Sequence, residues 1–236
     1  AKRSRETRKI KSSSLCKILC FRRCQLLNLK KFFYLILLLI AEPLLAKEKI
    51  VFYPKSIDKD CFAGRALSYD ECGYQKEVLK KALNEANEDG KIVLIVYGAE
   101  WCIWCHVFKD HIKGNYGKFS YKLEGQQGYD LDEKPSAAEI ELALELNAFV
   151  SKNFIVANIE AQHSFDGYDV LFETGGAKHI KDSIPFIYTV DENGIFLHDM
   201  PSTHELNALE KKRNGDDWYR GYNRDVLLQE LKKLLN

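Results

Sequence analysis

The sequence predicts an α/β fold in which a central sheet carries helices on both faces. Residues 92–97 form a continuous apolar run rich in β-branched side chains, and 154–159 is a largely apolar run of the same kind; both are typical of strands buried on both faces. A segment with helical character precedes each run. A turn at 191–194 (DENG) between two further apolar stretches predicts a hairpin. Buried strands that alternate with helices imply a sheet covered on both sides.

Local signals place the individual elements. Asp70 is the expected N-cap of the first long helix, and Gly90 supplies its stop. Ser136 and Glu139 have the capping-box spacing of a later helix. In chain order we expect a strand at 49–53, a helix at 70–89, a strand at 92–97, a helix at 102–112, a long loop at 114–134, a helix at 136–150, a strand at 154–159, a helical turn or two before 184, a hairpin of 185–190 and 195–198, and a closing helix at 226–235.

Charge is divided unevenly along the chain, although its formal net charge is only +1. Residues 1–46 hold eleven Lys or Arg and two acidic residues, which leaves 24 basic and 32 acidic residues for 47–236. A body with a net charge of −8 lacks the basic face that nucleic-acid phosphates require. We therefore expect no nucleic-acid partner.

The basic front end is typical of an export signal. Ten apolar residues, 32–41, follow two lysines, and Ala46 is a small residue at which a signal peptidase would cut. A membrane-spanning helix needs about 20 apolar residues, so we expect a cleaved signal and no stable membrane insertion afterwards. The predicted domains are thus a basic leader and signal peptide, 1–46, and one body, 47–236, exported to the periplasm or beyond.

The length of this leader has its own explanation. A signal peptide usually has a short basic region, and no methionine precedes Met200. Our hypothesis is that translation begins near Leu29 at an alternative start codon, in which case residues 1–28 are not translated. A genuine basic arm is the alternative.

Residues 100–106 (EWCIWCH) contain two overlapping motifs. WCxxC is a dithiol that shuttles electrons, whereas CxxCH is an attachment site for a c-type haem. A thiolate, not a thiol, attacks a disulfide, so the nucleophile needs a lowered pKa. Cys102 at a helix N-terminus faces unpaired N–H groups that favour negative charge, and Cys105 lies one turn further in. Cys102 is therefore the predicted nucleophile and Cys105 the resolving thiol.

A family resemblance supports the dithiol interpretation. The segment 99–105 (AEWCIWC) follows a strand and begins a helix, and 183–185 (SIP) opens a hairpin about 80 residues later. Over roughly residues 90–200 this order resembles the thioredoxin superfamily, and more closely exported thioredoxin-like proteins and the soluble C-terminal domain of the disulfide reductase DsbD. The resemblance implies a thioredoxin-like central mixed sheet, with a helical insertion at about 114–150 after the CxxC helix.

The resemblance also implies roles for single residues. Trp101 would cover one side of the site, Ile184 would offer its backbone to a bound peptide, and Pro185 would have a cis peptide bond and pack on the dithiol. Thioredoxin has a buried Asp at the position of Val96, so fast reduction requires a substitute for that carboxyl. Glu100 and His106 are the candidate acid–base groups. His106 is alternatively a passive residue of the first helical turn.

Four cysteines remain after leader cleavage, and an even number in an oxidising compartment suggests pairs. We expect Cys61 and Cys72 to form a structural disulfide that ties a loop to the first long helix. The alternative is a second redox pair that exchanges electrons with Cys102 and Cys105.

Other interpretations stay open. Haem attachment at CIWCH would need a distal ligand such as Met200. A zinc site needs four ligands, and the spacing of the cysteines outside the CxxC motif is unsuited to one. A non-catalytic thioredoxin-fold binding module or chaperone would use the 114–134 loop as its recognition surface. The aromatic side chains of that loop are Tyr116, Phe119, Tyr121 and Tyr129. Late aromatic residues are expected to pack on the last helix; these are Trp218, Tyr219 and Tyr222.

Taken together, the patterns predict an exported thiol–disulfide oxidoreductase with no cofactor and no metal. Its partners would be protein thiols and disulfides, and the resemblance adds a membrane disulfide reductase as a source of electrons. The direction of electron flow does not follow from the sequence.

Overall fold

The computed structural model describes residues 47–58, 60–61, 66–116, 120–121, 129–130, 135–181, 183–202, 210–214 and 217–236. The chain divides into two units, 1–45 and 46–236, and all elements below belong to the second. The predicted leader lies outside the described residues. Among the residues that are described, no helix combines the length and the apolar character needed to cross a membrane.

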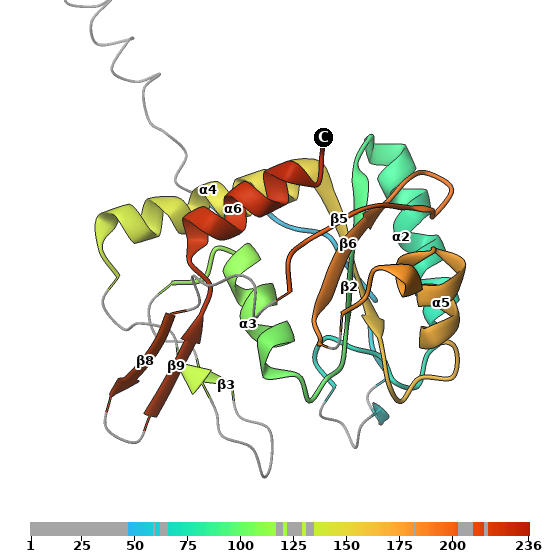
Figure 1. Ribbon diagram of the computed structural model, residues 1–236, viewed down its shortest axis with the longest axis horizontal. Coiled ribbons are helices and arrows are strands. Elements are labelled where there is room, and N and C mark those ends of the chain that lie inside the picture. Colours follow the sequence, from blue (N-terminus) through green and yellow to red (C-terminus); the bar gives the residue numbers. More distant parts are fainter. Residues whose placement is uncertain are drawn as a thin grey trace, which may run out of the picture. The chain divides into compact units, whose positions relative to one another are not determined.

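The centre of the second unit is a five-stranded mixed sheet (Figure 1). Its strands are β1 (Phe52–Tyr53), β2 (Ile92–Gly98), β5 (Phe154–Glu160), β6 (Phe186–Val190) and β7 (Phe196–Asp199). They lie in the order β1-β5-β2-β6-β7. β1, β5 and β2 are parallel, whereas β6 is antiparallel to β2 and β7 to β6. The predicted strands are confirmed, although β1 covers only the last two residues of the expected 49–53.

Helices cover both faces of this sheet, as predicted (Figure 1). They are α2 (Gln75–Asp89), α3 (Ile103–Ile112), α4 (Ala137–Asn153), α5 (Gly167–Glu173) and α6 (Arg224–Lys233). Side chains alternate along β2, so Leu94 and Val96 enter the core below α3, α4 and α6. Val93 and Ile95 enter the opposite core below α2 and α5. The continuous apolar run of β2 therefore reflects burial on both faces.

Local sequence signals set the starts of two helices, whereas a residue distant in the chain caps a third. The capping box of Ser136 and Glu139 forms as predicted, and Asn223 caps α6, which starts two residues earlier than expected. The predicted cap of α2 at Asp70 is wrong, because that helix begins only at Gln75. Asp166 caps α2 instead, since its carboxylate accepts hydrogen bonds from the backbone N–H groups of Gln75 and Lys76, at 2.7 and 3.0 Å.

A second, four-stranded sheet has the order β3-β4-β9-β8 and was not predicted. Its strands are β3 (Ser120–Tyr121), β4 (Tyr129–Asp130), β8 (Glu210–Asn214) and β9 (Asp217–Gly221). The expected loop at 114–134 thus contains two short strands, and a hairpin precedes α6. Two-residue strands and the sequence EKKRN of β8 lack the apolar alternation that identifies strands.

Tyr222, which follows this second sheet, is buried, and its backbone N–H donates to His111 of α3. Nε2 of His111 accepts this bond at 3.1 Å, and Nδ1 lies 2.9 Å from the carbonyl oxygen of Val107. His111 is therefore neutral, with its proton on Nδ1. Burial, and secondarily the charge of Arg224, lowers the pKa of His111 to about 3.

We expect this histidine to make the protein less stable in acid. Unfolded His111 takes up a proton below its ordinary pKa of 6.5, whereas the folded residue does so only near 3. The stabilisation is thus complete above pH 6.5 and is lost as pH falls toward 3. At pH 5 the loss is about 2 kcal/mol from this group. Urea titrations at pH 7 and pH 5 measure it. The variant His111→Gln should show a smaller pH dependence, and an equal one would contradict the assignment.

Candidate functional site

The cysteine pair lies between the end of β2 and the start of α3. Cys102 and Cys105 form a disulfide, and Cys102 is the N-cap of α3. Sγ of Cys102 accepts a hydrogen bond from the Cys105 N–H at 3.3 Å. Cys102 is 4% exposed and Cys105 is 1% exposed. After reduction, this N–H and the positive end of the helix dipole would stabilise a thiolate on Cys102.

Two of the three predicted substrate-contacting residues pack against this pair. Trp101 and Ile184 both pack against the apolar cluster that contains the two cysteines. Pro185 follows Ile184 at the start of β6 and is buried, and the peptide bond between them is cis. The Trp101 indole N–H donates to the side-chain oxygen of Gln162 at 2.8 Å, which orients the ring. The structure therefore brings four of the predicted residues together and places Pro185 next to Ile184 in the chain. Their roles in substrate binding and electron exchange stay predictions.

Glu100 and His106, the candidate acid–base groups, are both buried and in contact. Nε2 of His106 lies 2.7 Å from the Glu100 carbonyl oxygen and 3.5 Å from its Oε1. Burial lowers the pKa of His106 to about 4, so the ring is neutral near pH 7. Burial also raises the pKa of Glu100, against the opposing effect of backbone N–H groups. Val96 lies in the apolar core and offers no carboxyl, so proton exchange by Glu100 stays a prediction.

Residues 66–70, which we call the cover segment, lie against the cysteine pair and were not predicted to do so. Tyr69 of this segment is 1% exposed and packs with Cys102 and Cys105. A Cβ added to Gly98 would lie 2.5 Å from Sγ of Cys105 and 2.8 Å from the Tyr69 hydroxyl. Because Gly98 has no side chain, the buried sulfur of Cys105 and the hydroxyl of Tyr69 can approach each other at this position.

Polar contacts hold the cover segment in place. The Glu100 carboxylate accepts the backbone N–H groups of Ser68 and Tyr69, both at 3.0 Å. Lys109 of α3 donates to the Ser68 hydroxyl and to the Leu67 carbonyl. Burial is the main cause that lowers the pKa of Lys109 to about 8. The buried Glu100 thus connects the CxxC motif to the cover segment, which no sequence signal indicated.

A second disulfide brackets the cover segment. Cys61 and Cys72 are joined, with their Cα atoms 5.8 Å apart. Together with Asp70 they are the one grouping of possible metal ligands among the described residues. Both sulfurs are engaged in the disulfide, so the oxidised grouping offers a single carboxylate, which does not suit zinc.

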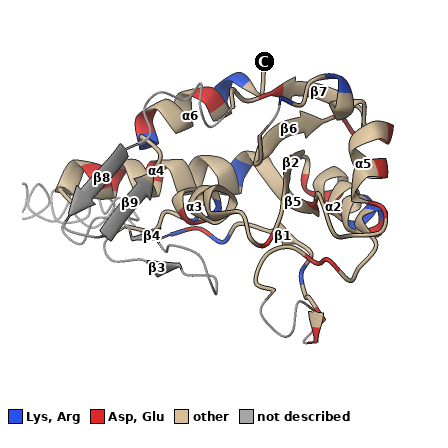
Figure 2. Cartoon of the chain, turned by 60° about the horizontal axis from the view of Figure 1, so that its bottom comes forward, with Lys and Arg blue, Asp and Glu red and all other residues tan. Residues whose placement is uncertain are grey.

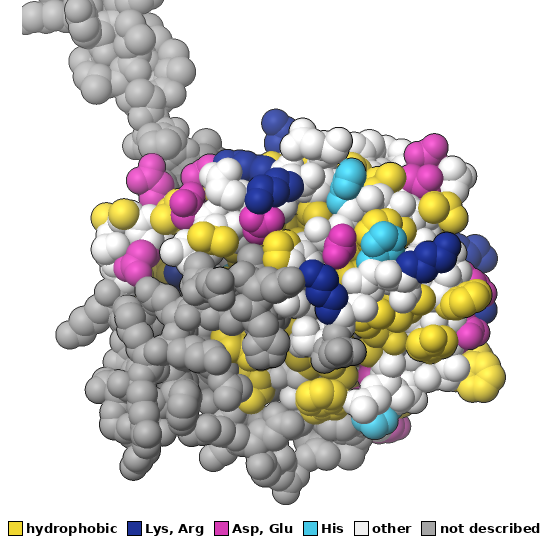
Figure 3. Space-filling model, viewed as in Figure 1, with side chains coloured by type: hydrophobic (Ala, Val, Ile, Leu, Met, Phe, Trp, Pro, Cys, Tyr) yellow, Lys and Arg dark blue, Asp and Glu magenta, His cyan; other side chains and the backbone are white. Residues whose placement is uncertain are grey.

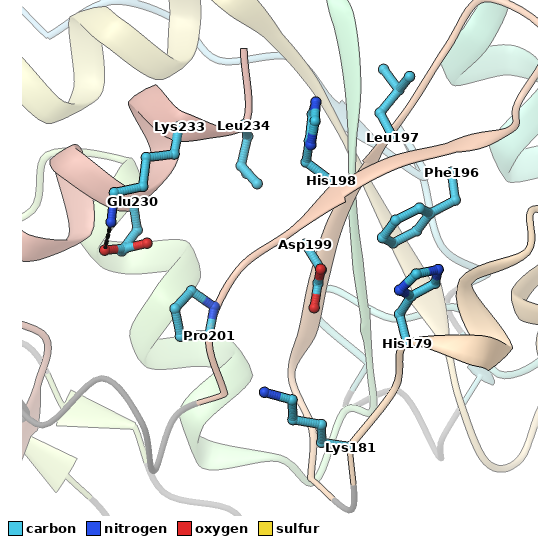
Figure 4. Close-up of a pocket in the computed structure, with 10 residues that line it drawn as sticks. All are labelled: His179, Lys181, Phe196, Leu197, His198, Asp199, Pro201, Glu230, Lys233 and Leu234. Atoms are coloured by element: carbon cyan, nitrogen blue, oxygen red, sulfur yellow. Dashed lines mark hydrogen bonds and ion pairs between the residues drawn. The ribbon is translucent and has the colours of Figure 1, made fainter. Parts of the chain in front are cut away.

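A separate cavity of about 610 Å³ lies between β7 and α6 (Figure 4). His179 stacks on Phe196 at its rim, with ring centroids 3.8 Å apart, and Glu230 pairs with Lys233 at 2.6 Å. The other lining residues are Lys181, Leu197, His198, Asp199, Pro201 and Leu234. This cavity holds no cysteine, so the candidate site is the cysteine pair.

Comparison with known proteins identifies no family for this chain. No protein-family profile matches the chain, and no curated protein matches it significantly. Among solved structures it is similar to a disulphide isomerase from Xylella fastidiosa Temecula1, at 21% identity and a TM-score of 0.36, over 57% of this chain and 79% of that one. The fold is thioredoxin-like. This assignment rests on the mixed five-stranded sheet with helices on both sides. A closer likeness to DsbD is not shown.

Proposed function

We propose that this thioredoxin-like protein is an exported thiol–disulfide oxidoreductase that exchanges its Cys102–Cys105 pair with protein substrates. The observation that carries the proposal is the position of the pair: the first sulfur caps a helix N-terminus, the second is buried in the first turn, and Ile184 packs against the cluster that contains both. Export is supported by the sequence of the leader and by the second cysteine pair. A membrane disulfide reductase that supplies electrons remains part of the proposal.

The exchange needs no cofactor beyond the dithiol. The Cys102 thiolate attacks one sulfur of a substrate disulfide, the substrate S–S bond breaks, and its other sulfur leaves as a thiolate that takes up a proton. Cys105 then loses its proton and attacks Cys102, which releases the second substrate sulfur. The substrate has gained two electrons and two protons, and the Cys102–Cys105 disulfide has formed. Glu100 is our candidate acceptor for the Cys105 proton because it is a buried carboxyl with a raised pKa.

Haem attachment is a poorer fit to the same residues. A c-type haem bound at CxxCH would require a ring nitrogen of His106 to reach the iron. That ring is buried, and its Nε2 is hydrogen-bonded to the Glu100 carbonyl oxygen.

A redox titration tests the proposed function. The protein is equilibrated in glutathione buffers, free thiols are alkylated, and the products are weighed by mass spectrometry. We expect Cys102 and Cys105 to titrate together as a two-electron couple. A midpoint near −270 mV would indicate a reductant and one of about −120 mV an oxidant. Failure to titrate as a couple would overturn the oxidoreductase and leave the non-catalytic binding module.

A further inference from the structure

Four aromatic side chains lie exposed on the loop after β5, on α5 and just before α2, although α5 also contributes to the core. We call them the aromatic patch: Tyr74, Phe165, Tyr168 and Phe172. Phe165 is 90% exposed and Phe172 69%. Tyr168 and Phe172 share the outer face of α5, while Val170 and Leu171 form its buried face. Figure 3 shows exposed hydrophobic side chains over the region of α5.

The loop that carries Phe165 is held rigidly. The fully buried carboxylate of Glu160 accepts the backbone N–H groups of Gln162, His163 and Ser164, at 2.6 to 3.1 Å. Asp166, the next residue after Phe165, accepts hydrogen bonds from the first two backbone N–H groups of α2. These hydrogen bonds hold the backbone at Phe165 in a conformation that leaves the ring in solvent. A loop whose backbone is already fixed loses little entropy on binding.

One end of the patch, at Phe165, lies on the loop that contacts the CxxC segment. Gly98 at the end of β2 pairs with Glu160 at the end of β5, so the loop after β5 starts beside the segment that leads to Cys102. Gln162 of this loop accepts the Trp101 indole N–H. On its other side, Phe165 meets Tyr74 edge to face, with centroids 6.3 Å apart. A polypeptide whose cysteine reaches Cys102 can thus lay its neighbouring residues on the patch.

The charges beside the patch indicate which kind of polypeptide would bind there. Lys76 pairs with Asp169 and Glu173, at 3.2 and 2.7 Å, which leaves two carboxylates for one ammonium. Figure 2 shows acidic residues on α5. Aromatic rings bind apolar side chains, and an excess of carboxylates favours basic neighbours. We propose that the aromatic patch binds unfolded polypeptide segments in which apolar and basic residues flank the reacting cysteine. This rests on the proposed function, since it names the substrate class of the same site.

The test uses the full chain and a thiol-free probe: lysozyme that has been reduced and blocked with iodoacetamide, which is basic, unfolded and unable to exchange disulfides. Its binding is measured by fluorescence anisotropy. The variant Phe165→Ser, Phe172→Ser should bind the probe at least tenfold more weakly. The matched control is Leu235→Ser, which removes a 37% exposed apolar side chain just after α6, a helix on the other face of the sheet from α5. This control should stay within twofold of wild type.

Several results would overturn the proposal. The proposal is wrong if the wild-type protein does not bind the probe. It is also wrong if the double variant binds the probe as tightly as the wild type does. A wild-type dimer that the double variant loses, with probe binding unchanged, would make the patch a self-association surface. Binding of the probe does not depend on thiols, so its outcome is separate from the redox titration. The double variant should also have a lower kcat/KM than wild type for scrambled lysozyme, but an unchanged kcat/KM for a small aromatic disulfide.

Discussion

Replacing Cys102 with serine should lower the rate of disulfide exchange by roughly a thousandfold or more, because a serine hydroxyl is not ionised near neutral pH. Replacing Cys105 with serine should instead stop the reaction halfway. Cys102 would still attack the substrate, and the mixed disulfide would persist because no resolving thiol is present. The adduct can be weighed intact by mass spectrometry without reductant.

The two variants together establish the roles of the sulfurs. The double variant Cys102→Ser, Cys105→Ser is the control and should form no adduct. Since Cys102 is the more exposed sulfur and caps α3, the adduct should appear with Cys105→Ser alone. An adduct formed at Cys105 in the Cys102→Ser protein would reverse the assignment.

Removing the second disulfide should have the largest effect on stability. The variant Cys61→Ala, Cys72→Ala should lose about 3 kcal/mol of unfolding free energy, from the loop entropy of an eleven-residue separation. Urea denaturation under oxidising conditions measures this loss. The cover segment lies between these cysteines, so Cys105 of the reduced variant should also be alkylated faster than in wild type.

The same variant distinguishes a structural disulfide from a second redox pair. With a structural role, the variant still exchanges disulfides at the temperature where it is folded, because Glu100 and Lys109 continue to hold the cover segment. A folded variant that has lost turnover would show that electrons pass through Cys61 and Cys72. An unchanged unfolding free energy would contradict the structural role.

Much of the fold follows from local patterns. β2 and β5 are predictable because strands buried on both faces must be apolar throughout. The capping box of Ser136 and Glu139 and the start of α3 at Cys102 depend on residues within one turn of each other. The same proximity in the chain made the pairing of Cys102 with Cys105 predictable.

By itself, the sequence determined the thioredoxin-like order of elements, the CxxC motif at a helix start and the pairing partners of the cysteines. Only the tertiary structure decided what surrounds them: the Asp166 cap of α2, the cover segment over Cys105, the burial of Glu100 and the exposure of Phe165. The physical reason is separation along the chain. A helix cap or an apolar repeat joins near neighbours and leaves a local pattern, whereas a carboxylate that binds a backbone N–H some 30 to 90 residues away leaves none.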